Sequence, residues 1–113
     1  MLNMRDYRVY LQDILKCIEK IESYVNNITY KAFSSNNMVQ DAVIRNLEII
    51  GEASKRIPEE VKENASHIEW RKIAGIRDVL IHDYAEVDLE IVWDVVQNKL
   101  PILKDGIKDL LNN

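Results

Sequence analysis

The chain has 113 residues, enough for one domain with its own core, and its 47% hydrophobic and 30% charged residues exclude a disordered segment and a membrane protein. Its three glycines and two prolines are too few for turn-rich sandwiches or barrels and favour a few long helices. The net charge of −4 argues against a general nucleic-acid or membrane-surface binder but leaves room for a local basic pocket.

The sequence also bears on redox chemistry and location. Cys17 is the only cysteine, so we expect no internal disulfide and no zinc site built on cysteines. No apolar run approaches the roughly 18 residues of a membrane span, and the first residues lack the apolar stretch of a signal peptide. We therefore expect a cytoplasmic protein with no membrane partner, no metal site and no cofactor.

The first helix is predicted from apolar residues that recur at steps of four and three, which is the period of one helix face. They are Tyr7, Leu11, Ile14, Ile18, Ile21 and Val25. Residues 29–37 are polar and predict a loop that ends in a helix N-cap.

A second helix is predicted over residues 37–56, with Val39, Val43, Leu47 and Ile50 on its apolar face. Gly51 lies inside this helix, where glycine is unfavourable, and therefore indicates a close approach of another helix. A short third helix is expected to begin at Pro58, whose fixed φ suits a first turn.

Two more helical patterns follow. One begins at Trp70 and should stop near residues 82–84, and its apolar residues are Trp70, Ile73, Ile76 and Leu80. The last begins after a cap at Asp88 and continues through Trp93, Val96, Leu100, Leu103, Ile107 and Leu110. Pro101 should kink or split it. The sequence thus predicts a single all-α bundle of four main helices plus one short helix.

The polar side chains of Arg77, Asp78, His82 and Tyr84 lie close together at the expected end of a helix. On an ideal helix Arg77 and His82 point about 140° apart, so they converge only if the helix ends near His82 or the guanidinium reaches around. Asp78 and His82, four residues apart, would face each other on a continuous helix, and the carboxylate could then favour the protonated imidazole.

A cluster of this kind suits phosphodiester chemistry. A guanidinium binds phosphate oxygens and stabilises negative charge in the transition state, and an imidazole exchanges protons near neutral pH. RNA supplies its own nucleophile, the 2′-hydroxyl, so the reaction needs no metal. The alternative is structural, because such residues at a helix C-terminus often only cap carbonyls or pair on the surface.

The motif Arg77-x4-His82-x-Tyr84 resembles the RX4HXY motif of HepT-like toxins, a branch of the HEPN superfamily. Three more stretches resemble the family in order and with matching gaps: residues 45–53, 68–77 and 88–93. Many members have Asn where this chain has Asp78, which places a negative charge near an anionic substrate.

The resemblance implies a HEPN-type bundle of up-down topology over residues 1–113, a single domain that is usually a homodimer. It implies a metal-independent endoribonuclease, the toxin of a toxin–antitoxin pair, with Arg77 and His82 as catalytic residues and Asp78 in support. The implied partners are RNA and a minimal nucleotidyltransferase (MNT) antitoxin, which in the family transfers AMP units from ATP onto the tyrosine that corresponds to Tyr84.

The residue chemistry agrees with a dimer. Each chain has one motif histidine, whereas cleavage benefits from a base and an acid, so we expect both copies of Arg77 and His82 at one interface cleft. AMP on Tyr84 would occupy that cleft and weaken RNA binding.

Other residues carry weaker expectations. A polar stripe on the second helix could border the cleft or be a solvated face, and it consists of Asp41, Arg45, Glu48 and Glu52. A local basic patch is expected from Lys55, Arg56, Arg71 and Lys72. We expect Trp70 and Trp93 to anchor the core, His67 to lie on the surface and Cys17 to have no redox role.

Two other functions fit the same residues. The chain could be a non-catalytic accessory subunit of a nucleotidyltransferase, in which Arg77 and His82 hold a nucleotide or the partner's substrate. It could also be a purely structural helical partner, in which case these residues affect only the stability of a complex.

Overall fold

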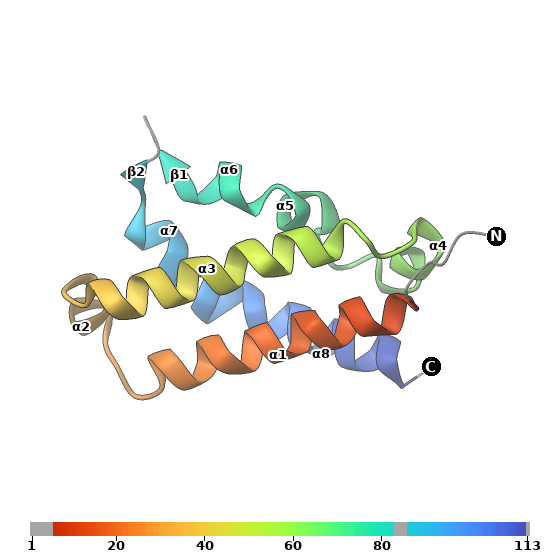
Figure 1. Ribbon diagram of the computed structural model, residues 1–113, viewed down its shortest axis with the longest axis horizontal. Helices are drawn as coiled ribbons and strands as arrows, with labels where there is room; N and C mark the ends of the chain where they lie inside the picture. Colours follow the sequence, from red (N-terminus) through yellow and green to blue (C-terminus); the bar gives the residue numbers. More distant parts are fainter. Residues whose placement is uncertain (1–5, 83–85, 113) are drawn as a thin grey trace.

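The structure is a computed structural model that describes residues 6–82 and 86–112, with the backbone alone at Ile81, His82 and Glu86. The four main helical segments run in alternating directions, so the chain is an up-down, all-α bundle as predicted (Figure 1). Its main segments are α1 (Tyr7–Val25), α3 (Asn37–Ser54), the pair α5 (Trp70–Ala74) and α6 (Ile76–Leu80), and the run α7 (Leu89–Asp94), η2 (Val95–Lys99) and α8 (Leu100–Leu111).

The helices α1 and α3 lie side by side and antiparallel, and α8 packs against α1 (Figure 1). Polar side chains cap the N-termini of α1 and α3. The Asp6 side chain accepts a hydrogen bond from the backbone N–H of Arg8 at 2.9 Å, and the Asn36 side chain accepts one from that of Val39 at 3.1 Å. The predicted apolar stripes form the core, with side chains fully buried at Leu11, Ile14, Ile18, Ile21, Val43, Leu47 and Ile50.

The loop predicted over residues 29–37 is wrong in part, because it contains the short helix α2 (Tyr30–Ser34). The hydroxyl of Thr29 caps this helix by accepting from the N–H of Ala32 at 3.1 Å. The Phe33 side chain is fully buried, and its ring centre lies 5.2 Å from that of Trp93. Tertiary burial of one aromatic residue therefore gives helical structure to a segment without a repeating apolar pattern.

The short third helix is confirmed as α4 (Glu59–Lys62), which continues into the 3₁₀ turn η1 (Glu63–Ala65). The pattern that begins at Trp70 is interrupted at Gly75, where α5 ends and α6 begins. The last helix is also interrupted. A π-helical turn, η2, precedes Pro101, whose ring nitrogen cannot donate a hydrogen bond, and the N–H of Leu100 bonds to the carbonyl of Val95.

The close approach predicted at Gly51 is confirmed. A Cβ atom at this position would lie 2.9 Å from the carbonyl oxygen of Ile73 and 3.0 Å from the Ile76 side chain. Glycine therefore lets α5 and α6 pack directly on α3, although a glycine inside a helix is unfavourable by itself.

We expect Gly51→Ala to lower the free energy of unfolding by about 1–2 kcal/mol, since overpacking costs about 1–3 kcal/mol and the gain in helix propensity offsets up to about 1 kcal/mol. Urea denaturation measures the change. The matched control is Gly75→Ala, whose Cβ would lie 3.5 Å from its nearest neighbour. It should leave stability unchanged or raise it by up to about 1 kcal/mol. Equal stability of both variants would contradict the close approach.

The chain turns back sharply after α6. Two-residue strands β1 (Ile81–His82) and β2 (Glu86–Val87) pair antiparallel, with His82 opposite Glu86. The N–H of Asp88 bonds to the carbonyl of Leu80 at 3.0 Å, and the Asp88 carboxylate caps α7. With this pairing, α6 and α7 pack against each other. Among the described residues, no helix is long and apolar enough to cross a membrane.

Candidate functional site

Arg77 and Asp78 lie on α6, and both side chains are exposed. The helix ends at Leu80, so of the two geometries considered, the one in which it stops before His82 holds. The helix that would align Asp78 with His82 does not continue to His82, because His82 belongs to β1. The side chain of His82 and the whole of Tyr84 lie outside the described part of the chain.

A polar depression of about 370 Å³ lies beside Arg77, between α3 and the α5–α6 segment. Its lining comprises Glu48, Gly51, Glu52, Lys55, Ala74, Gly75, Ile76, Arg77 and Asp78. Two residues of the predicted polar stripe, Glu48 and Glu52, therefore share a site with Arg77. Arg45 and Asp41 are exposed on the same helix and lie outside this described lining.

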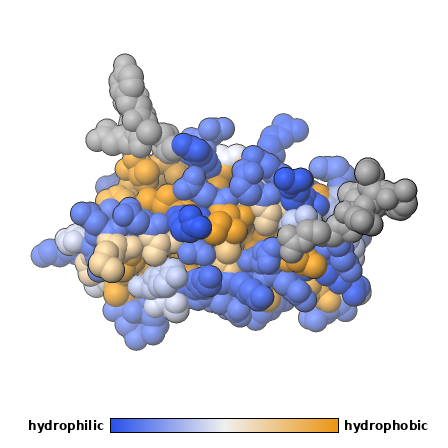
Figure 2. All heavy atoms as spheres, in the orientation of Figure 1, coloured by the Kyte–Doolittle hydropathy of each residue, from blue (hydrophilic) through white to orange (hydrophobic). Residues whose placement is uncertain are grey.

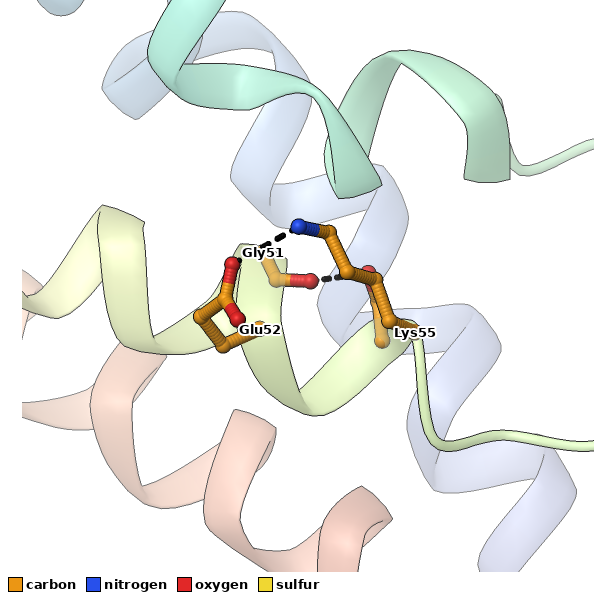
Figure 3. A network of polar contacts seen from close by, with 4 residues as sticks. Gly51, Glu52 and Lys55 are labelled. Carbon is orange, nitrogen blue, oxygen red and sulfur yellow. Dashed lines mark hydrogen bonds and ion pairs between the residues drawn. The ribbon is translucent and has the colours of Figure 1, made fainter.

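Opposite charges meet in the polar depression. The Nζ atom of Lys55 lies 2.8 Å from Oε2 of Glu52, on the side of α3 that faces α5 and α6 (Figure 3). The hydrogen bond from Lys55, together with its positive charge, holds the pKa of Glu52 below its ordinary value. Among the described residues, no acidic side chain forms an ion pair with Arg77.

A second hollow, the apolar groove, has a volume of about 290 Å³ and lies between α5–α6 and the run from α7 to α8. Its residues include Ile50, His67, Ile68, Ile73, Ile76, Val79, Ile91, Val95, Leu100, Ile102 and Leu103. Val79 is 40% exposed and Ile102 is 50% exposed. In Figure 2, hydrophobic residues are likewise exposed between hydrophilic ones on the face shown.

Charged residues stand around the apolar groove. The carboxylate of Glu69 lies between two lysines, with Oε2 at 2.9 Å from Nζ of Lys72 and Oε1 at 3.8 Å from Nζ of Lys99. The hydrogen bond from Lys72, together with its positive charge, lowers the pKa of Glu69. Lys72 lines this groove, whereas Lys55 lines the polar depression. The two lysines of the expected basic patch therefore belong to different hollows.

The aromatic and sulfur side chains take structural positions. Trp70 is buried, and its indole N–H donates to the carbonyl of Ala65 at 3.1 Å. Trp93 is half-buried and packs on Phe33. Cys17 lies in the core, where burial raises the pKa of its thiol and keeps it protonated.

The exposed Arg77 side chain lies beside the polar depression. Among the side chains that the structure describes, no three of His, Cys, Asp or Glu are grouped to hold a metal ion. An exposed guanidinium at the edge of a polar hollow can bind a phosphate and stabilise added negative charge.

Sequence reasoning did not single out Ala74 and Gly75, which line the depression beside Arg77. Lys55 was predicted to lie on the polar face of the second helix and in a basic patch, and not beside Arg77. No local signal could have joined Lys55 to Arg77, because their proximity depends on how α3 packs against α5 and α6.

Comparisons with known proteins agree on one family. A family model described as "Ribonuclease HepT-like" matches residues 14–110. The chain is 43% identical over 106 residues to a protein of Thermococcus cleftensis named as a probable ribonuclease HepT, covering 94% of this chain and 96% of that one.

Proteins of Methanocaldococcus jannaschii are also similar. One, whose name joins a gamma-glutamylcyclotransferase with an inferred RNase, is 44% identical over 107 residues; the match covers 95% of this chain and 48% of that protein, so this chain spans about half its length. Another, named as an inferred RNase, is 37% identical over 96% of this chain and 90% of its own length. No solved structure gives a significant match.

Proposed function

The chain belongs to the HepT-like ribonuclease family, and from this premise we propose that it is a metal-independent endoribonuclease, the toxin of a HepT/MNT toxin–antitoxin pair that acts in the cytoplasm. The observation that carries the proposal is the exposed guanidinium of Arg77 at a polar depression, five residues before the motif histidine. The names of the relatives, which refer to RNases, support the same activity.

The proposed reaction uses groups that the motif and the substrate supply. An imidazole of His82 removes the proton from the ribose 2′-hydroxyl, and the 2′-oxygen forms a bond to the adjacent phosphorus. The bond from phosphorus to the 5′-oxygen breaks, and that oxygen takes a proton from a protonated imidazole. Arg77 stabilises the extra negative charge on the phosphate oxygens in the transition state. The products are a 2′,3′-cyclic phosphate and a free 5′-hydroxyl.

Base and acid together call for two imidazoles, so the proposed site is shared by two copies of the chain. The apolar groove supports this: its exposed side chains, Val79 and Ile102, are of the kind that association removes from water. Val79 lies two residues after Arg77 on α6, so a partner seated there would come close to the motif.

The test is cleavage of single-stranded RNA by the purified protein in EDTA, beside an oligonucleotide of the same sequence with 2′-deoxy sugars. We expect the protein to cleave the RNA and not the 2′-deoxy oligonucleotide, because only RNA carries the 2′-hydroxyl nucleophile. The RNA products should end in 2′,3′-cyclic phosphates. If the protein binds nucleotides but cleaves no RNA, the accessory-subunit function is favoured instead.

We further propose that an MNT-type partner neutralises the toxin by transferring AMP from ATP to Tyr84. The phosphate of the attached AMP would then compete with RNA for Arg77. With the partner and ATP present, RNA cleavage should stop in the wild type and continue in Tyr84→Phe, as measured by cleavage assays beside mass spectrometry of the protein.

The control for this prediction is Tyr24→Phe, which alters a tyrosine on α1 that is 38% exposed. It should be modified and inhibited like the wild type. Equal cleavage by modified and unmodified protein would remove the proposed regulation.

A further inference from the structure

The ion pair between Glu52 and Lys55 lies in the same hollow as Arg77. Glu52 lies on α3 and Lys55, three residues later, is its C-cap residue, and their side chains are 72% and 51% exposed. An exposed ion pair contributes little to stability, so it can exchange partners at small cost. Lys55 is therefore a cation beside the proposed phosphate site. Its ammonium group is paired with the carboxylate of Glu52.

The charges in the polar depression are nearly balanced. The carboxylates are those of Glu48, Glu52 and Asp78, and the cations are Lys55 and Arg77. The carboxylates repel an RNA backbone that enters this hollow, so binding there needs more than one cationic contact to offset the repulsion. Lys55 is the only described lysine in the lining, so it is the group that can supply a second contact.

We infer that Lys55 is a second phosphate ligand for RNA in the polar depression, and that Glu52 occupies it until the RNA backbone takes its place. The inference rests on the proposed ribonuclease function and adds substrate-binding residues outside the RX4HXY motif. Figure 3 shows the geometry that makes it specific: Lys55 leans back over Glu52, toward α5 and α6. The two side chains act on substrate binding in opposite directions: Lys55 strengthens it and Glu52 weakens it.

Direct binding tests the inference without cleavage. The probe is a fluorescent single-stranded RNA with every 2′-hydroxyl methylated, and its Kd is measured over a series of salt concentrations. Lys55→Gln should weaken binding about tenfold and lower the salt slope by about 0.7, the value for one phosphate contact on a single strand. Glu52→Gln should tighten binding several-fold, because it releases Lys55.

A double-variant cycle separates partner exchange from a general effect of charge. In the Lys55→Gln background, Glu52→Gln should give little further tightening, since no lysine remains to be released. The matched control is the ion pair between Glu22 and Lys104, also 2.8 Å long, which joins α1 to α8 outside the depression. Glu22→Gln and Lys104→Gln should each leave the Kd within about twofold of the wild type.

The possible results distinguish failure of this inference from failure of the proposed function. If the wild type cleaves RNA while the Lys55 and Glu52 variants bind like the control variants, the inference is overturned and the proposed function stands. If Glu52→Gln tightens binding equally with and without Lys55, Glu52 acts only through its charge and the exchange is overturned. A wild type that neither binds nor cleaves RNA would overturn the proposed function together with the inference.

Discussion

Arg77→Ala is expected to lower the rate of RNA cleavage by at least about 100-fold, because in the proposed mechanism the guanidinium offsets negative charge on phosphate in the transition state. The side chain is exposed on α6 and contributes nothing to the core, so the folded state should be unaffected. Single-turnover cleavage of RNA, beside a thermal melt of each protein, measures both quantities.

His82→Ala should reduce cleavage by a similar factor, about 100-fold or more, since the reaction would lose its proton-transfer group. The two variants separate in their pH profiles. The Arg77→Ala protein should keep the bell-shaped dependence that two imidazoles produce at reduced height, whereas the His82→Ala protein should lose it.

Two controls make the Arg77 result specific. Arg77→Lys keeps the charge but loses the bidentate fork, so it should retain an intermediate rate. Lys108→Ala removes an exposed cation on α8 and should cleave like the wild type. Cleavage by Arg77→Ala at the wild-type rate would contradict the proposed catalytic role of Arg77.

The largest effect on stability is expected at Phe33. Its side chain is fully buried, with its ring centre 5.2 Å from that of Trp93 and 6.5 Å from that of Tyr30. Phe33→Ala should lower the free energy of unfolding by about 3–5 kcal/mol, because it leaves a cavity and removes the aromatic contacts. Urea denaturation followed by circular dichroism measures the loss.

Phe33→Leu keeps much of the volume and should cost less than the alanine variant, which matters if the latter fails to fold. Met38→Ala truncates a side chain that is 83% exposed on α3, and it should change stability by less than about 0.5 kcal/mol. A loss below about 1 kcal/mol in Phe33→Ala would mean that α2 is not anchored by this ring.

The long helices were predictable because their signals are local and repeated. Over α1 and α3, apolar side chains recur every three or four residues, and Asn36 caps α3. Residues 30–34 hold too few apolar side chains for such a period. Their helix depends on contact between Phe33 and Trp93, which lie far apart in the sequence. Periodicity does not report such contacts.

Some features of the candidate site were also predictable from the sequence, and others were not. The spacing of Arg77, His82 and Tyr84 is a property of the sequence, and so was the resemblance to the family, which the comparisons confirm. The end of α6 at Leu80, two residues before His82, was one of two geometries that the spacing allowed. Backbone pairing of β1 with β2 decided between them.

By itself, the sequence determined the helical class, the two long helices and the order of the motif residues, because helix periodicity and chain order are local properties. Only the tertiary structure decided which groups stand beside Arg77. The missing side chain at Gly51 lets α5 and α6 pack directly on α3, and this contact brings Glu48, Glu52 and Lys55 into the same hollow.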